Sequence, residues 1–565
     1  MSVFKDFSDF YNIPIFHKGK LLQKLREEWI KPKEKWRDYS RIKQLLALTT
    51  DSGQKGLVDD KTWHDLGMDA VFESVDVTQS EIGQQVLYKN MHLLEEKGDN
   101  LQKKYEFAAS LRDEEKLRES LQVSLYSVSF VSAVPCVRFL FKPFDLVKIP
   151  KVPAVLWFVF SVGVFLCSAL FRLEILYLIA FLVLVVNFYV SRRFVSIVEP
   201  YSVALSYIKT IVSVSHSMCL QKGSDSIDFV KSLKEEIKGI RRTKYSLGLL
   251  LFGQSSPNLI ISYPLFLVNL FVPIDMLFYS LLINSVERNK YIMRLCFNAI
   301  GEIDSSIAFA SYLERYPNHC NPEFSSGWSL DFKNVRHPLV ANCVGNSFKS
   351  QGESAMITGS NMAGKTTFIR VIGINMILSR TFWLCHAEKA IVPLCNIASS
   401  ISNSDFIEEG KSYYFSELEH INRFLHLSGS GEQYLFLIDE IFRGTNTVER
   451  IGGSAAVLQK LARGGVVFVT THDRELEDYL TPSYTMFHFL ETGDKEKPFD
   501  YKIRSGVCRS RNALKLMASI GFPDELVEQA KVVANQIERR YPSLAYLDES
   551  EPGAVVTSNT KLTHP

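Results

Sequence analysis

The chain has 565 residues, of which 46% are hydrophobic and 22% are charged, and its formal net charge is +2. This length suggests two or more domains, and the near-neutral charge excludes recognition of nucleic acid by overall charge alone. Nine cysteines occur without a CxxC pair or a Cys/His spacing that suits zinc, so we expect reduced and mostly buried thiols.

Residues 1–50 form the first predicted segment, which is polar and partly helical. The opening MSVFKDFSDFYNIPIF lacks the basic-then-apolar order of a signal peptide, which favours a cytoplasmic catalytic part. Between Lys18 and Lys43 ten Lys/Arg stand against four Asp/Glu, a local excess of +6 (ten minus four). This pattern indicates a solvated amphipathic helix, which we favour, or a surface for phosphate or anionic lipid.

Residues 51–330 are predicted to form a helical core and lever domain, because apolar residues recur at three- and four-residue steps. Within it, Val152–Phe171 carries no charge, Arg172-Leu173-Glu174 interrupts the run, and Ile175–Val190 continues it. A bilayer core of about 30 Å needs roughly 17–25 helical residues for each crossing. Residues 152–190 therefore predict a transmembrane helical hairpin, with a buried helical pair or a re-entrant loop as the alternative.

Basic residues flank this hairpin at both ends. Lys148 and Lys151 precede it, and Arg192 and Arg193 follow it. Because positive charge is retained on the cytoplasmic side of a membrane, both ends of the hairpin are predicted to lie there.

A second apolar stretch, Asn258–Ile283, contains Pro264, Pro273 and Asp275. A carboxylate in the middle of a bilayer is costly. We therefore expect this stretch to be a core helix rather than a membrane span.

From about residue 331, short β-rich runs alternate with helical stretches, which is the pattern of an α/β sheet. The sequence GSNMAGKT at Gly359–Thr366 follows an apolar strand, precedes a helical run and fits the G-x4-G-K-[ST] phosphate loop. Backbone amides there would surround phosphates, Lys365 would contact the β and γ oxygens, and Thr366 would offer its hydroxyl to Mg²⁺. The residues predicted to bind nucleotide in this loop are Gly359, Ser360, Asn361, Met362, Ala363, Gly364, Lys365, Thr366 and Thr367.

Two further apolar runs end in candidate catalytic groups. Tyr434–Ile438 ends in Asp439 and Glu440; we expect the first acid to hold Mg²⁺ and the second to activate water as a general base. His472 follows the run Val466–Thr470, and from the residues alone it is either a γ-phosphate sensor or a capping or core histidine. The predicted activity is Mg²⁺-dependent ATP hydrolysis, with Glu440, His472 and Lys365 as its catalytic groups.

These residues resemble the MutS family of DNA mismatch-repair ATPases. The family's phosphate loop is similar to ITGSNMAGKTTFIR, and its acid-bearing strand is similar to LIDEIFRGTNT. Its histidine switch is similar to VTTHDREL. The resemblance implies that His472 senses the γ-phosphate. GKSYYFSEL matches the family's G-x-S-x-F-x-x-E signature, which implies that Ser412 reaches the nucleotide of an opposing subunit; an ordinary helix N-cap is the alternative.

The resemblance extends beyond these motifs. The opening of the family's helical core is similar to LVDDKTWHDLGMDAVFESVDVTQSEIGQQVLY, which includes Gly83. The family's connector helix is similar to AIGEIDSSIAFASY. SRNALKLMASIGFPDELVEQAK resembles the C-terminal helix–turn–helix through which relatives dimerise. The implied architecture is a helical domain at 51–330 with the inserted hairpin, an ABC-type P-loop α/β ATPase domain with the helix–turn–helix at 331–540, and a disordered tail at 541–565.

Several positions depart from the family pattern. Only about fifty residues precede the predicted core, and the Phe-x-Glu at Phe415–Glu417 falls inside the predicted ATPase domain, so we expect no mismatch-reading module of the usual kind. The hairpin stands where relatives carry a DNA-gripping clamp. Ser360, Ala363 and Phe442 replace a proline and two glycines, and the aromatic residue that stacks on adenine has no clear match near Cys343.

The sequence thus predicts a homodimeric ATPase anchored in the cell membrane through residues 152–190, with its ATPase domain in the cytoplasm. Two outputs remain open. One is DNA binding as in the family, in mismatch repair or on another DNA structure. The other is a membrane-tethered mechanical or scaffolding role without DNA. A transporter is disfavoured because no intramembrane charge marks a substrate path.

Overall fold

The computed structural model describes residues 15–31, 34–51, 53–96, 98–129, 132–142, 151–219, 234, 267–268, 271–272, 274–360, 362–401, 413–491, 499–507, 517 and 521–540. The chain divides into two compact units. The first comprises Met1–Lys55, Phe72–Leu93 and Gln102–Pro317, and the second comprises Gly56–Val71, Leu94–Leu101 and Asn318–Pro565. The second unit thus includes three short pieces that the sequence-based range 51–330 assigned to the helical domain, namely Gly56–Val71, Leu94–Leu101 and residues 318–330.

Helices build the first unit. They are α2 (Ile15–Ile30), α3 (Tyr39–Ile42), α4 (Gln44–Thr49), α6 (Met68–Val75, which begins in the second unit), α7 (Glu81–His92), α8 (Gly98–Asp113, likewise), α9 (Glu115–Leu125), the 3₁₀ turn η1 (Tyr126–Val128), α10 (Val134–Phe141), α11 (Lys151–Phe171), α12 (Glu174–Cys219) and α16 (Ile274–Arg315). The longest are α12, with 46 residues, and α16, with 42. These two pack against each other.

The crossing of α7 and α16 depends on small residues and one buried acid. A Cβ atom on Gly83 of α7 would lie 2.2 Å from Asp304 Oδ2 of α16, and one on Gly301 of α16 would lie 2.2 Å from Val86 Cγ2. The Asp304 carboxylate accepts hydrogen bonds from Gln79 N (2.9 Å) and Ser80 N (2.8 Å), just before α7 begins. Close packing and an acid at the helix N-terminus therefore fix α7 on α16.

The basic segment between Lys18 and Lys43 contributes several ion pairs to this unit. Arg26 on α2 contacts Glu119, and Arg37 Nε lies 2.9 Å from the buried Asp76 Oδ2. Lys35 Nζ donates to Thr78 O at 3.0 Å. These three cations therefore form contacts within the first unit.

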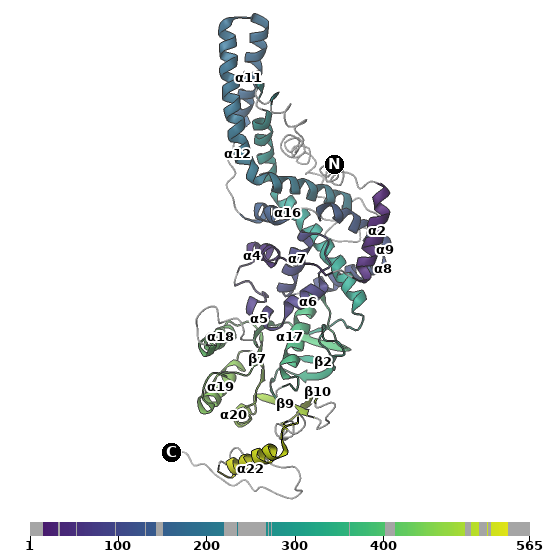
Figure 1. Cartoon of the computed structure of the whole chain (residues 1–565), viewed down its shortest axis with the longest axis vertical. Helices are drawn as coiled ribbons and strands as arrows, with labels where there is room; N and C mark the ends of the chain where they lie inside the picture. Colours follow the sequence, from purple (N-terminus) through teal and green to yellow (C-terminus); the bar gives the residue numbers. More distant parts are fainter. Residues whose placement is uncertain are drawn as a thin grey trace. The chain divides into compact units, whose positions relative to one another are not determined.

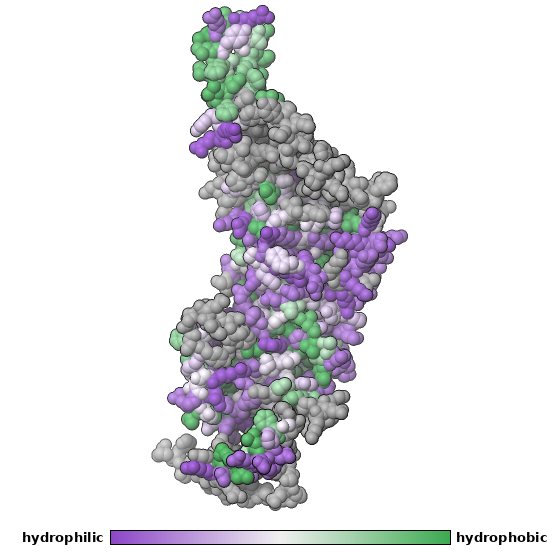
Figure 2. Space-filling view, in the orientation of Figure 1, coloured by the Kyte–Doolittle hydropathy of each residue, from purple (hydrophilic) through white to green (hydrophobic). Residues whose placement is uncertain are grey.

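The predicted hairpin consists of α11 and the first part of α12, which pack side by side (Figure 1). Two stretches of the described residues, Val152–Phe171 and Glu174–Arg193, are long and apolar enough to cross a membrane, with mean hydropathies of 2.4 and 2.1. Only 17% and 22% of these windows are buried. Figure 2 shows the resulting apolar surface on the hairpin, with hydrophilic residues at its tip.

The stretch Asn258–Ile283 is described only at residues 267–268, at 271–272 and from Ile274 onward. Leu267, Val268 and Phe271 are 41%, 44% and 46% exposed. This exposure differs from the burial that we expected of a core helix.

Two sheets organise the second unit. One has the order β1-β5-β2-β3 and the other β10-β9-β4-β8-β7-β6. The strands are β1 (Glu323–Ser325), β2 (Leu330–Val335), β3 (Asn346–Ser350), β4 (Ser354–Thr358), β5 (Lys389–Pro393), β6 (Asn396–Ser400), β7 (Tyr434–Asp439), β8 (Val466–Thr470), β9 (Tyr484–Glu491) and β10 (Phe499–Ser505). In the six-stranded sheet all neighbours are parallel except β10 and β9.

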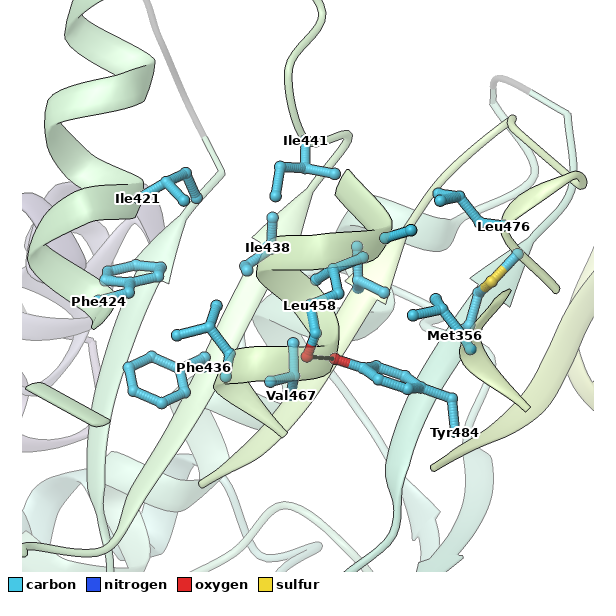
Figure 3. Close-up of a cluster of buried hydrophobic side chains, with 14 of the residues drawn as sticks. Met356, Ile421, Phe424, Phe436, Ile438, Ile441, Leu458, Val467, Leu476 and Tyr484 are labelled. Atoms are coloured by element: carbon cyan, nitrogen blue, oxygen red, sulfur yellow. Dashed lines mark hydrogen bonds between the residues drawn. The ribbon is translucent and has the colours of Figure 1, made fainter. Parts of the chain in front are cut away.

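Helices cover both faces of the six-stranded sheet. The helices of this unit are α5 (Asp60–Asp65), α17 (Lys365–Phe382), α18 (Tyr413–Ser428), α19 (Thr447–Leu461), α20 (Leu476–Leu480) and α22 (Asp524–Arg540). Side chains alternate between the faces of a strand. Accordingly, Phe436 and Val467 pack in one buried cluster with Phe424 of α18 and Leu458 of α19 (Figure 3), whereas Leu437 closely approaches α17 on the opposite face.

The predicted combination of a helical part and an α/β part is confirmed. The tail at 541–565 lies outside the described residues, as does most of the segment that joins β10 to α22. Of the stretch predicted to form a helix–turn–helix, the structure describes α22, Met517 and residues 521–523, so the motif stays a prediction.

Candidate nucleotide-binding site

The predicted phosphate loop turns sharply between β4 and α17. Gly359 and Gly364 have φ values of 137° and 103°, in the region that favours glycine. A Cβ on Gly359 would lie 2.9 Å from Phe489 O. Met362 has a φ of 73° and a side chain that is 78% exposed, while Ala363 is buried and Asn361 lies outside the described residues.

Lys365 begins α17 and turns back into the loop. Its Nζ donates to Gly359 O (2.7 Å) and Ser360 O (3.0 Å) and lies 3.3 Å from His472 Nε2. Burial lowers the pKa of Lys365 to about 8, while Glu440 and Asp439 act in the opposite direction. The loop therefore holds a buried ammonium group that an anion could recruit.

Three parallel strands bring the other predicted groups to the same edge. Register pairs Ile357 of β4 and Asp439 of β7 with Thr470 of β8, so all three strands end together. Such an edge is where open α/β sheets bind ligands. Thr366 Oγ1 donates to Asp439 Oδ2 at 3.0 Å, and Thr470 Oγ1 donates to the other oxygen of this carboxylate.

Hydroxyl and carboxylate oxygens are the ligands that Mg²⁺ prefers in proteins. Thr366 and Asp439 fit that requirement, because their oxygens converge from the helix and from the strand. Arg443 Nη2 also contacts Asp439 Oδ2, at 3.2 Å.

Glu440 and His472 form the second half of the constellation. Glu440 Oε1 lies 2.9 Å from His472 Nε2, and Oε2 lies 2.8 Å from Arg443 Nε. The hydrogen bond with His472 lowers the pKa of Glu440 against the effect of burial, and Arg443 adds to the lowering. The carboxylate is therefore ionised at neutral pH, which a general base requires.

Neighbouring side chains hold the two loops that carry these groups. The carboxylate of Glu417, the acid of the Phe-x-Glu at Phe415–Glu417, accepts a hydrogen bond from Phe442 N, and burial raises the pKa of Glu417. Arg450 of α19 binds Asp473 through two hydrogen bonds of 2.8 and 2.7 Å, directly after His472. This Phe-x-Glu acid thus fixes the loop after β7 rather than facing a ligand.

Some predicted residues do not join the cluster. Thr367 lies on the exposed side of the first turn of α17. Ser360 contributes its carbonyl to Lys365, and its buried hydroxyl has no partner within the described part of the chain. Ser412 lies outside the described residues.

Tyr501 of β10 is a neighbour of the loop that sequence reasoning missed. A Cβ on Gly364 would lie 3.3 Å from Tyr501 Cδ1, and this tyrosine is 45% exposed. Asn346 Nδ2 donates to Tyr501 O at 3.0 Å and so holds the backbone. Cys343, where we sought an aromatic residue, instead accepts a hydrogen bond from His337 N. About 135 residues separate Tyr501 from the loop, so only the strand order brings them together.

Comparison with known proteins gives a consistent picture. Residues 355–538 match the family model of MutS domain V. The chain is similar to the DNA mismatch repair protein MutS of Thermotoga petrophila, with 30% identity over 43% of this chain and 32% of the relative. The corresponding proteins of Petrotoga mobilis and Clostridioides difficile are 31% and 28% identical over 43% and 46% of this chain. The matched part spans about a third of the length of these relatives.

Proposed function

Because this chain belongs to the MutS family, we propose that its second unit is a Mg²⁺-dependent ATPase that works as a homodimer. The observation that supports this best is the convergence of Lys365, Asp439 and Glu440 at the ends of β4 and β7, the two parallel strands that flank β8. The relatives, which are named as DNA mismatch repair proteins, supply the family context.

In the proposed reaction, loop amides and Lys365 bind the β- and γ-phosphates. Thr366 and Asp439 would hold Mg²⁺, which neutralises phosphate charge when bound. Glu440 takes a proton from the attacking water, and His472, already beside Glu440 and Lys365, contacts the γ-phosphate. Ser412 of the opposing subunit would complete this site.

The ring of Tyr501 is proposed to contact the base of the nucleotide. It is half-exposed beside Gly364, and an aromatic face stacks favourably on a base of any sequence. Tyr501 would then take the role of the adenine-stacking aromatic residue for which the sequence near Cys343 shows no clear match.

We further propose that residues 152–190 anchor the protein in the cell membrane, with the ATPase on the cytoplasmic side. The length, hydropathy and low burial of α11 and the first part of α12 support this anchor. The cations at Lys151, Arg192 and Arg193 favour this orientation.

DNA binding is proposed from the names of the relatives, which are DNA mismatch repair proteins. Where relatives carry a clamp, this chain has an apolar hairpin. That observation favours the second candidate, a membrane-tethered mechanical or scaffolding ATPase that does not bind DNA.

Three measurements on the full chain test the proposal, the first two on detergent-solubilised protein and the third on membranes. Calorimetric titration should show ATP binding that requires Mg²⁺ for full affinity. The absence of binding heat would refute the nucleotide site.

DNA binding is tested by titrating duplex or branched DNA at several salt concentrations. The affinity should fall steeply with added salt, because phosphate contacts release counterions. If no DNA binds at low salt, the scaffolding role is left as the output.

The membrane anchor is tested by carbonate extraction. Full-length protein should stay with the membranes, whereas protein lacking Val152–Val190 should be soluble. Recovery of the intact chain in the soluble fraction would refute the anchor.

A further inference from the structure

One buried amide connects three segments at the hairpin. Asn187 of α12 is fully buried, and its Oδ1 accepts a hydrogen bond from Trp157 Nε1 of α11 at 2.9 Å. Its Nδ2 donates to Phe271 O at 3.1 Å. A buried amide is costly unless its polar atoms are paired. Asn187 thus ties the turn around Phe271 to both helices of the hairpin.

Apolar packing places the same turn against the hairpin. The ring of Phe271 contacts that of Phe165 on α11, with centroids 5.2 Å apart and planes at 67°. The helix that follows, α16, packs against both α11 and α12. Yet Leu267, Val268 and Phe271 remain between 41% and 46% exposed. This turn is therefore covered on one side by the hairpin and presents apolar surface on another.

The hydrogen bonds also set the depth of the turn. Trp157 stands six residues after Lys151, and Asn187 stands six residues before Arg193. At about 1.5 Å per helical residue, both lie roughly 9 Å from the flanking cations. Phe271 O lies at the level of Asn187, well short of the midplane of a bilayer core of about 30 Å.

The direction of α16 agrees with this depth. Ser215 Oγ donates to Cys296 O, so α16 runs beside α12 away from the tip of the hairpin.

We propose that Leu267, Val268 and Phe271 form a third membrane-embedded element, a shallow apolar wedge that contacts acyl chains of the cytoplasmic leaflet. This inference rests on the proposed membrane anchor. The wedge makes α16 a membrane-attached helix: it begins next to the lipid and ends at Arg315, three residues before the second unit resumes at Asn318.

Photolabelling from the lipid phase tests the wedge. The full chain is reconstituted in phosphatidylcholine/phosphatidylglycerol vesicles that contain phospholipids with a diazirine either near the headgroup or at the end of an acyl chain. We expect Leu267, Val268 and Phe271 to be labelled by the shallow probe more than by the deep one, and the deep probe to label Leu166 of the hairpin. Labelled residues are located by peptide mass spectrometry.

The outcomes separate the two proposals. Labelling of the hairpin without residues 267–271 would overturn the wedge alone, whereas absence of lipid labelling on both would overturn the anchor and the wedge together. The variant Asn187→Leu should reduce labelling of residues 267–271 by about threefold, the effect expected for an interhelical hydrogen bond in a membrane, and leave the hairpin labelled. Ser161→Ala is the matched control, since the buried Ser161 hydroxyl has no partner among the described residues. Equal labelling in Asn187→Leu would show that Asn187 does not hold the wedge.

Discussion

At the scale of single residues, the chemistry of the site depends on how Glu440 is held. Glu440 has a φ of 52°, which is uncommon for a residue with a side chain, and its N–H donates to Thr470 O at 2.9 Å. This backbone turn points the carboxylate toward His472 and Arg443. Strained backbone of this kind concentrates at functional sites, and here it presents an ionised acid at the edge of the sheet.

The variant Glu440→Gln tests the role of this acid. We expect ATP binding to persist and hydrolysis to fall by about 10²–10⁴-fold, because the amide cannot accept a proton from water. Calorimetry and steady-state phosphate release measure the two quantities. Glu449→Gln is the control, since Glu449 is exposed at the start of α19 and its carboxylate accepts a hydrogen bond from Thr445. Equal turnover of Glu440→Gln and the unmodified protein would exclude Glu440 as the base.

The pH dependence of nucleotide affinity tests Lys365. In the free protein burial lowers the pKa of Lys365 to about 8. A bound triphosphate favours the charged ammonium, so above pH 8 binding must take up a proton. Affinity should therefore be constant below about pH 8 and fall by up to about tenfold per pH unit above it. Calorimetric titrations between pH 7 and 9.5 measure this change, and a constant affinity over that range would contradict it.

The residues of the loop and of the acid pair were predictable from sequence because their spacing is local. The glycines, Lys365 and Thr366 lie within one turn, and Asp439 and Glu440 end one apolar run. The partners of these groups were not predictable in the same way. Thr470 bonds Asp439 because β8 lies beside β7, and Arg443 reaches both acids because the loop after β7 turns back.

At the scale of elements, the close crossing of α7 and α16 gives a stability prediction. Gly83→Ala would place a methyl group 2.2 Å from the buried Asp304 Oδ2, so one helix must shift. We expect a loss of about 1–3 kcal/mol in unfolding free energy, the usual cost of overpacking a core. Denaturant unfolding of the detergent-solubilised chain measures it. A loss below 0.5 kcal/mol, on the order of a surface substitution, would contradict the crossing.

Gly19→Ala is the matched control for this prediction. Gly19 lies in α2, and a Cβ there meets nothing within 4 Å among the described residues. Alanine in an exposed helical position is expected to be neutral or to stabilise by about 0.5–1 kcal/mol. Changes of opposite sign in unfolding free energy for the two glycine substitutions would separate the effect of packing from that of helix propensity.

Sequence patterns predicted the kinds of element better than their partners. The apolar run Val152–Phe171 indicated a long helix from its length alone, and α11 covers it. The stretch Asn258–Ile283 was expected in a core because a carboxylate such as that of Asp275 is costly in a bilayer. Its residues do not indicate which helix lies beside them. The contacts of Phe271 with Asn187 and Phe165 depend on a fold that returns to the hairpin about 80 residues later.

At the scale of the whole molecule, the proposed homodimer can be tested by mixing subunits. A composite site takes Lys365 from one subunit and Ser412 from the other. If so, Ser412→Ala and Lys365→Ala proteins should each be inactive, but their mixed dimer keeps one site in which both residues are intact. A twofold dimer has two equivalent sites, so random exchange at equal concentrations should restore about a quarter of the unmodified activity.

Complementation distinguishes this arrangement from a site built within one subunit. If Ser412 acted on the nucleotide of its own subunit, each site of the mixed dimer would lack either Ser412 or Lys365, and mixing would restore nothing. Phosphate release measured against the mixing ratio should therefore peak near equal amounts. Mixing Lys365→Ala with Glu440→Gln is the control, because both residues belong to the same half of the site. A site of this mixed dimer would keep both residues only if Lys365 and Glu440 acted from opposite subunits. Their placement on one edge of the same sheet excludes that arrangement, so this mixture should restore no activity.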